Sequence, residues 1–152
     1  MLTLIDSKCY GFGLLMTFVL GLFLVSCKPG NDIDEILNSY NLTEFESRDE
    51  AIVELQEVAA TDPESVREFL QTNKQQDLSK TFVCLKALTL EDPSGSVEII
   101  KDFYDDSDPR LRDTVIGAIG KSNDPEIHAI VLEATGDQDE AVRATAFFFL
   151  NP

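Results

Sequence analysis

The stretch DPRLRDTVIGAI, residues 108–119, carries the pattern that decides the fold of this chain. The same pattern begins at Asp77 in DLSKTFVCLKAL and at Asp139 in DEAVRATAFFFL, so that successive copies differ by 31 positions. In each copy apolar residues recur every three or four positions, which is the spacing of one face of a helix. The sequence therefore predicts three equivalent helices whose apolar faces contain coinciding residues: Cys84, Val115 and Ala146; Leu85, Ile116 and Phe147; and Leu88, Ile119 and Leu150.

A second apolar series with the same spacing lies between these segments. It comprises PESVREFL from Pro63, SGSVEIIK from Ser94 and PEIHAIVL from Pro125. One repeat is thus a pair of helices, and we find no strand pattern in the chain. Stacked pairs that contact only their neighbours form a solenoid, so we expect an all-α fold: a short right-handed α-solenoid of antiparallel helix pairs with a period of about 31 residues. Aspartate caps followed by proline predict helix starts at Asp62-Pro63, Asp108-Pro109 and Asp124-Pro125.

The last unit fits the pattern D-x-x-V-R-x-x-A, with Asp139, Val142, Arg143 and Ala146. This pattern resembles the HEAT-like repeats that include those of phycobilisome-lyase type, over roughly residues 47–150. The preceding unit matches next best, and the earliest units lack the arginine. We expect the repeat arginines to form a structural ladder with neighbouring aspartates. The residues that carry the likeness in the preceding unit are Asp108, Leu111, Arg112 and Val115, and Thr81 stands where an earlier arginine would be.

The amino-terminal segment contains an apolar run, GFGLLMTFVLGLFLV, at residues 11–25. The run is shorter than the roughly 20 residues of a membrane-spanning helix and fits the core of a signal peptide. Its ending, LVSC at residues 24–27, resembles the lipobox of bacterial lipoproteins. The resemblance implies cleavage before Cys27, a diacylglycerol on its thiol and an acyl chain such as palmitate on the new amino terminus. The alternatives are an uncleaved helix and an ordinary cleaved signal.

These observations divide the chain into three parts. Residues 1–26 are expected to be a lipoprotein signal peptide, and residues 27–46 the lipidated cysteine, a tether and a short helix. Residues 47–152 are expected to form the HEAT-like repeat domain. By the family rule, Lys28 in place of aspartate favours the outer membrane of the bacterial envelope, on the side that faces the periplasm.

Composition excludes one class of partner. The chain has 12 basic and 28 acidic side chains and a formal net charge of −16. Such a surface repels a nucleic-acid backbone, so we expect no nucleic-acid partner.

The segment DFYDDSDPR contains the densest acidic patch. It lacks the glycine and the terminal glutamate of an EF-hand calcium loop, and a solvated turn capped by Asp108 is the favoured interpretation. Aromatic residues beside acids also suit the binding of a basic peptide. The three consecutive phenylalanines of AFFFLNP cannot all face inward, so they either pack on the preceding pair or form a docking surface. The residues of a possible interaction surface are Phe103, Tyr104, Asp105, Asp106, Phe148 and Phe149.

Few residues are available for catalysis or metal binding. Cys84 lies in an apolar pattern and is expected to be buried, and His128 is expected to be a partly buried structural histidine. We therefore predict no catalytic, metal-binding or cofactor-binding residue, and no enzymatic activity. The predicted function is a membrane-anchored scaffold or adaptor that binds an unknown protein in the bacterial envelope. The alternative is a lyase-like or accessory protein that holds a chromophore or a substrate protein on its repeats.

Overall fold

The computed structural model describes residues 32–74 and 76–151, and within them every regular element is helical, as the sequence predicts. A short helix precedes the repeats, as expected for the segment from Asp32. The elements are α1 (Ile33–Ser39), α2 (Phe45–Thr61), α3 (Pro63–Thr72), α4 (Leu78–Glu91), the 3-10 helix η1 (Ser94–Ser96), α5 (Val97–Tyr104), α6 (Pro109–Ile119), α7 (Pro125–Glu133), the 3-10 helix η2 (Ala134–Gly136) and α8 (Glu140–Leu150).

Aspartates set the starts of these helices. At all three predicted Asp-Pro positions the aspartate side chain accepts a hydrogen bond from a backbone amide of the first turn, and proline is the first helical residue. Asp77 and Asp139 cap α4 and α8 in the same way. Because a cap satisfies amides that have no partner inside the helix, these aspartates define where each helix begins.

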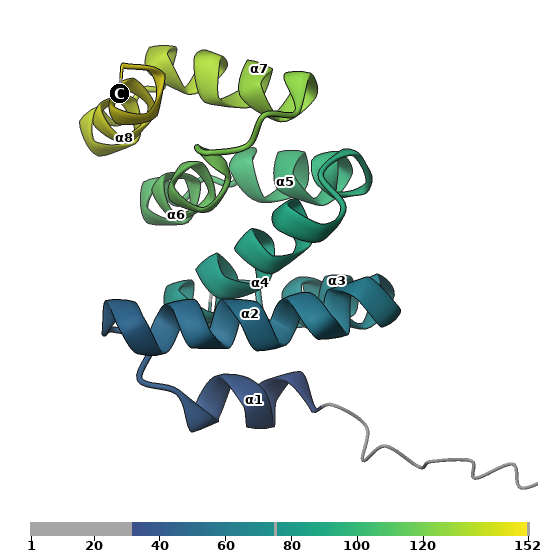
Figure 1. Cartoon of the computed structure of the whole chain (residues 1–152). Helices are drawn as coiled ribbons and strands as arrows, with labels where there is room; N and C mark the ends of the chain where they lie inside the picture. Colours follow the sequence, from purple (N-terminus) through teal and green to yellow (C-terminus); the bar gives the residue numbers. More distant parts are fainter. Residues whose placement is uncertain (1–31, 75, 152) are drawn as a thin grey trace, which may run out of the picture.

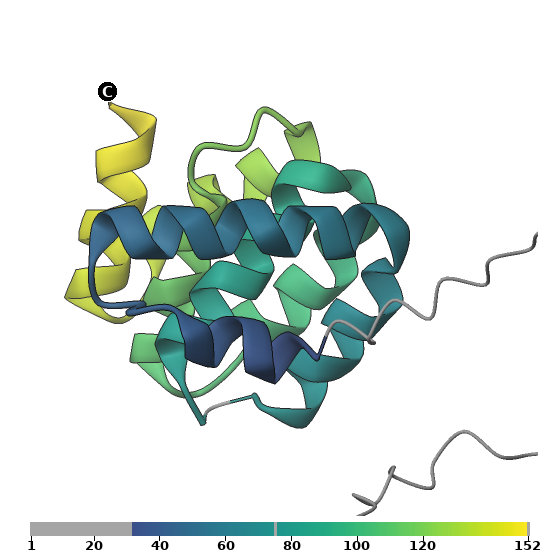
Figure 2. The same ribbon diagram turned by 60° about the horizontal axis from the view of Figure 1, so that its bottom comes forward.

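The helices form two rows that follow the chain (Figure 1). In the first row α2 contacts α4, α4 contacts α6, and α6 contacts α8. Helices α3, α5 and α7 lie beside this row. Both α3 and α7 contact the first-row helices that precede and follow them in the chain. Helix α5 contacts α6, and the 3-10 helix η1 just before it contacts α4. Helix α1 packs on α2, and Figure 2 shows the two helices side by side. Packing between neighbouring helices is therefore confirmed.

The buried apolar residues form one continuous core that includes residues of every α-helix from α1 to α8. Cys84, Val115 and Ala146, which coincide in the repeated pattern, are all fully buried. Leu85 and Ile116 are also fully buried, as the pattern predicts. Burying an aliphatic side chain of this size stabilises the fold by about 1.5–3 kcal/mol. The repeated apolar positions thus supply much of the hydrophobic stabilisation.

Phe147 is an exception to the pattern. It coincides with Leu85 and Ile116 and is expected in the core, but its side chain is 51% exposed. That expectation is wrong, because α8 contacts α6, α7 and η2 but no later helix within the described residues. Phe149 instead packs against the core, and Phe148 is exposed.

Two glycines, Gly117 in α6 and Gly120 at its C-terminal cap, lie beside phenylalanines of α4 and α8. Gly120 lies directly under Phe149, and a Cβ atom there would overlap the aromatic ring. We expect Gly120→Ala to destabilise the protein by about 1–3 kcal/mol, since Phe149 would have to leave its packed position. At Gly117 a Cβ atom would lie 3.5 Å from Cε2 of Phe82, an ordinary contact. Gly117→Ala is the matched control and should stabilise the helix by about 0.5–1 kcal/mol in urea unfolding.

No helix in the described part of the chain is both long and apolar enough to cross a membrane. Cys27 and the lipobox lie outside the described residues. The signal peptide and the lipid anchor therefore stay predictions.

Candidate functional site

Arg112 joins two successive loops of the repeats. Its Nε and Nη2 atoms donate to Oδ2 and Oδ1 of Asp137, each at 2.8 Å, in a two-bond ion pair. Its Nη1 atom donates to the backbone oxygens of Asp106 at 2.9 Å and Ser107 at 3.2 Å. The side chains of Arg112 and Asp137 are 15% and 6% exposed. The predicted ladder between arginine and aspartate is thus present at this junction and is structural.

The surroundings of Asp137 favour its charged form. The hydrogen bonds from Arg112 lower the pKa of Asp137 to about 2, and the backbone amide of Asp139 also donates to its carboxylate. The Tyr104 hydroxyl lies 3.4 Å from Oδ2 of Asp137. Burial and the nearby Asp137 charge raise the pKa of Tyr104 to about 12, so this phenol stays neutral at ordinary pH.

At the neighbouring junctions other cations hold the loops. Nη1 of Arg143 donates to the backbone oxygens of Asp137 at 2.8 Å and Gln138 at 2.9 Å, which repeats the Arg112 arrangement 31 residues later. Where Thr81 replaces the arginine, Nζ of Lys74 lies 3.8 Å from a carboxylate oxygen of Asp106. Each loop is therefore fixed by a cation, but the cation comes from a different element.

The Asp137 junction predicts a specific loss of stability in acid. Because the pKa of Asp137 falls from 3.8 to about 2 on folding, its contribution is complete above pH 3.8 and disappears as the pH falls through about 2. Urea unfolding between roughly pH 5 and pH 2 should show this loss. In Asp137→Asn the dependence should be shallower over the same interval. Equal slopes in both proteins would contradict the assignment.

The acidic patch singled out in the sequence surrounds this junction and is largely structural. Asp108 caps α6, as predicted. Phe103 is fully buried and does not reach the surface. Tyr104 is mostly buried against Asp137, but it lines an open hollow of about 710 Å³ together with Asp105 and Asp106. Asp105 is exposed and Asp106 is half-buried.

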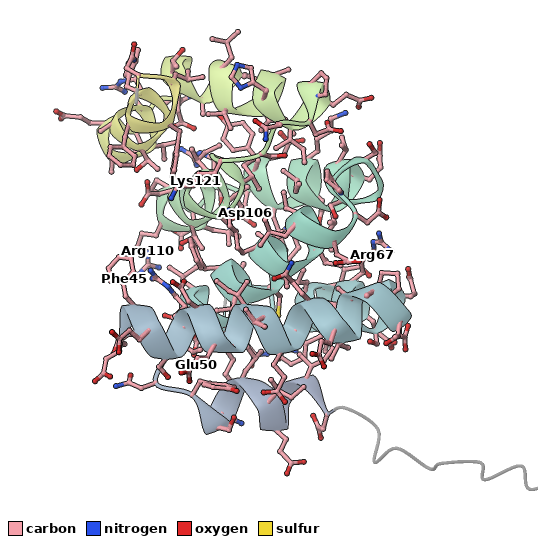
Figure 3. All side chains as sticks on the ribbon, viewed as in Figure 1. Phe45, Glu50, Arg67, Asp106, Arg110 and Lys121 are labelled. Carbon is pink, nitrogen blue, oxygen red and sulfur yellow. The ribbon has the colours of Figure 1, made fainter. Side chains whose placement is uncertain are left out.

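A second surface contains cationic side chains that form no ion pair within the described residues. It is a groove of about 800 Å³ that runs over α2, α4, α6 and α8, and we call it the cationic groove. Figure 3 shows two of its residues, Phe45 and Lys121, on the same side of the molecule. Its lining residues are Phe45, Arg48, Asp49, Ile52, Phe82, Lys86, Gly117, Lys121, Ala144, Thr145, Phe148 and Phe149.

Arg48 forms one wall of the groove. The central carbon of its guanidinium lies 4.5 Å from the ring centre of Phe45 and 4.7 Å from that of Phe82. Such cation–π contacts fix the position of an arginine and leave its N–H groups able to donate. Nε of Arg48 is buried and has no hydrogen-bond partner among the described residues. The two rings therefore hold the positive charge of Arg48 at the wall of the groove.

Lys86 and Lys121 supply two further charges. Lys86 is half-buried, and burial together with the nearby positive charge of Lys121 lowers its pKa. Asp49 partly offsets this effect, but neither lysine forms an ion pair within the part of the chain that the structure describes. Two like charges held close together favour an anion between them, because an anion relieves their repulsion.

Aromatic side chains complete the groove at α8. Phe148 is 70% exposed and meets Phe149 edge to face, with ring centres 5.2 Å apart. Both residues belong to the surface proposed from the sequence, and the structure places them together at this end of the groove. The groove thus combines apolar rings with positive charge.

The three cations were not predicted from the sequence, although the 31-residue spacing relates one of them, Lys86, to two other residues of the groove. Lys86, Gly117 and Phe148 differ by 31 positions and share one face of the repeats, and all three line the groove. Arg48 and Lys121 lie outside the equivalent segments, and only the fold brings them to this face. The 31-residue spacing could therefore have indicated this face, but not its charge.

Two single residues complete the comparison with the sequence. Cys84 is fully buried, as expected, and burial raises the pKa of its thiol to about 12. His128 is exposed, so the expectation of a partly buried histidine is wrong; Ile127 and Ile130 provide the buried face of α7.

Within residues 32–74 and 76–151 no group of three or more histidine, cysteine, aspartate or glutamate side chains is placed to hold a metal ion.

No family model, curated protein or solved structure matches this chain. Its function must therefore be argued from the groove itself.

Proposed function

We propose that this protein is a non-catalytic scaffold of the bacterial cell envelope, which is anchored by lipid at Cys27 and binds a partner protein through the cationic groove. Its helices form a short right-handed α-solenoid of HEAT-like repeats with a period of about 31 residues. Solenoids use extended surfaces of this kind to bind other proteins. The observation that carries the proposal is the groove, in which Arg48, Lys86 and Lys121 lie beside exposed aromatic rings without an ion pair in the described chain.

The three unpaired cations of the groove differ from most other cations in the described chain. The chain has a net charge of −16, and most of the other cations in the described residues form ion pairs or hydrogen bonds within the fold. Unused cations that cluster in a groove suggest recognition by charge complementarity. The cations that form ion pairs with acidic side chains are Arg67, Lys74, Lys80, Arg110 and Arg112.

The placement of the groove suits a tethered scaffold. Helix α1 begins at the right of the view in Figures 1 and 3, whereas Phe45 and Lys121 of the groove lie on the left. The five peptide units from Cys27 to Asp32 extend at most about 18 Å. An anchor at Cys27 would therefore hold the Asp32 side close to the membrane and leave the groove directed toward the aqueous compartment.

The anchor is tested by mass analysis of the protein purified from native membranes. The proposal predicts a chain that begins at Cys27, carries a diacylglycerol and an acyl chain, and fractionates with the outer membrane. Cys27→Ala should abolish the modification and release or misprocess the protein. Cys9→Ala is the control, because Cys9 lies in the segment that is removed, and it should leave the lipid in place.

Two results would contradict the proposal. An unmodified Cys27 in a chain that retains residues 1–26 would contradict the lipid anchor. A coloured protein with a bound pigment would favour the alternative, a lyase-like or accessory protein that holds a chromophore.

A further inference from the structure

We infer that the cationic groove binds an extended or helical segment of the partner that carries acidic side chains next to aromatic or aliphatic ones. This inference rests on the proposed function and adds the chemistry of the ligand. We expect the carboxylates of the partner segment to contact Lys86 and Lys121, and its apolar side chains to contact the exposed rings of Phe45 and Phe148.

The charges in the groove favour an anion, because Arg48, Lys86 and Lys121 outweigh the one lining carboxylate, Asp49. Lys86 is half-buried, and its pKa is lowered by burial and by Lys121. A carboxylate between the two ammonium groups would stabilise both, since it replaces a repulsion with two attractions. Arg48 contributes a third positive charge, and its buried Nε has no partner in the described chain.

The apolar surface selects for a side chain next to that anion. Ile52 and Ala144 add apolar surface to the lining, together with the rings of Phe45 and Phe148. Phe45 is 75% exposed and Phe148 is 70% exposed, so a bound aromatic or aliphatic side chain would cover both rings. Exposed rings beside cations are typical anchors of protein interfaces.

The shape of the groove favours a chain segment as the ligand. The lining comes from four helices, α2, α4, α6 and α8, so it extends along the row rather than closing around one point. A peptide can place charged and apolar side chains in alternation along such a surface. An anionic membrane surface suits it less well, because Phe45 and Lys121 of the groove lie away from the start of α1, the end of the described chain nearest the proposed anchor.

Binding of synthetic peptides to the full-length protein tests the inference. The first probe is a peptide of about twelve residues in which aspartate and glutamate alternate with leucine and phenylalanine. The second replaces the acids with asparagine and glutamine, and the third replaces the apolar residues with serine. We expect the first peptide to bind at least about tenfold more tightly than either of the others, and more weakly as salt is added.

Variants of the protein locate the binding. Lys86→Gln combined with Lys121→Gln should weaken the first peptide at least about tenfold. Lys101→Gln is the matched control, because Lys101 is an exposed lysine of α5 outside the groove, and it should change nothing. Circular dichroism of each variant verifies that the helices are retained.

Several results would overturn the inference. They are equal binding of the three peptides, no binding of the first, or equal binding by the double variant and the parent. Vesicles of phosphatidylglycerol form a separate arm, and vesicle binding that is lost in the double variant would assign the groove to a lipid surface instead. If the protein is lipidated and the double variant binds the partner as well as the parent does, the proposed scaffold function stands and only this inference is overturned.

Discussion

Arg112→Ala should lower the free energy of unfolding by about 3 kcal/mol. The substitution removes two hydrogen bonds from the Asp137 carboxylate, which is only 6% exposed in the parent protein. It also removes the donor to the backbone oxygens of Asp106 and Ser107. A buried charge that loses its partner costs far more than an exposed one, because water does not replace the lost contacts. Urea unfolding monitored by circular dichroism measures the change.

Arg110→Ala is the control for this prediction. Arg110 lies on the same helix and pairs with Asp108 at 2.8 Å, but its side chain is 78% exposed. Exposed ion pairs contribute about 0–1 kcal/mol, so this variant should unfold almost like the parent. If both arginine variants lost the same stability, the junction between the loops would have no special role.

Leu85→Ala should destabilise the protein by about 2–5 kcal/mol, whereas Phe147→Ala should change stability by less than about 0.5 kcal/mol. The two residues hold the same position in the repeated pattern but differ in burial, since Leu85 is fully buried and Phe147 is 51% exposed. Truncation of Leu85 leaves a cavity between packed helices, and truncation of Phe147 mainly exposes helix surface to water. Thermal and urea unfolding of the two variants give the comparison.

A large loss in Phe147→Ala would show that α8 is covered more fully than the structure indicates. A small loss in Leu85→Ala would contradict the placement of α4 in the core. Ile116→Ala is a further control at the same repeat position and should behave like Leu85→Ala, because Ile116 is also fully buried.

Local features of the sequence predicted most of the fold. The 31-residue spacing and the Asp-Pro pairs indicated the helices and their starts, since helix caps and apolar periodicity depend on residues close together in the chain. The burial of Cys84 follows from the same pattern. The exposure of Phe147 could not be predicted in this way, because it depends on which helices cover α8 and not on the helix itself.

The site was harder to predict than the fold. The sequence directed attention to the acidic patch near Asp106, but there the charges hold loops together through Arg112 and Lys74. Phe148 and Phe149 were singled out, and they line the groove. The cations that accompany them come from separate parts of the chain, and only tertiary packing brings Arg48, Lys86 and Lys121 to one surface.

Capture from native membranes tests the central claim, that the groove holds a partner for a lipid-anchored scaffold. Tagged full-length protein, the Lys86→Gln and Lys121→Gln double variant, and the Lys101→Gln control are cross-linked in cells, solubilised in detergent and compared by quantitative mass analysis. The account predicts one abundant envelope protein that is recovered with the parent and the control, is depleted at least about tenfold with the double variant, and is cross-linked through an acidic segment. Equal recovery with all three proteins, or cross-links that avoid the groove, would contradict it.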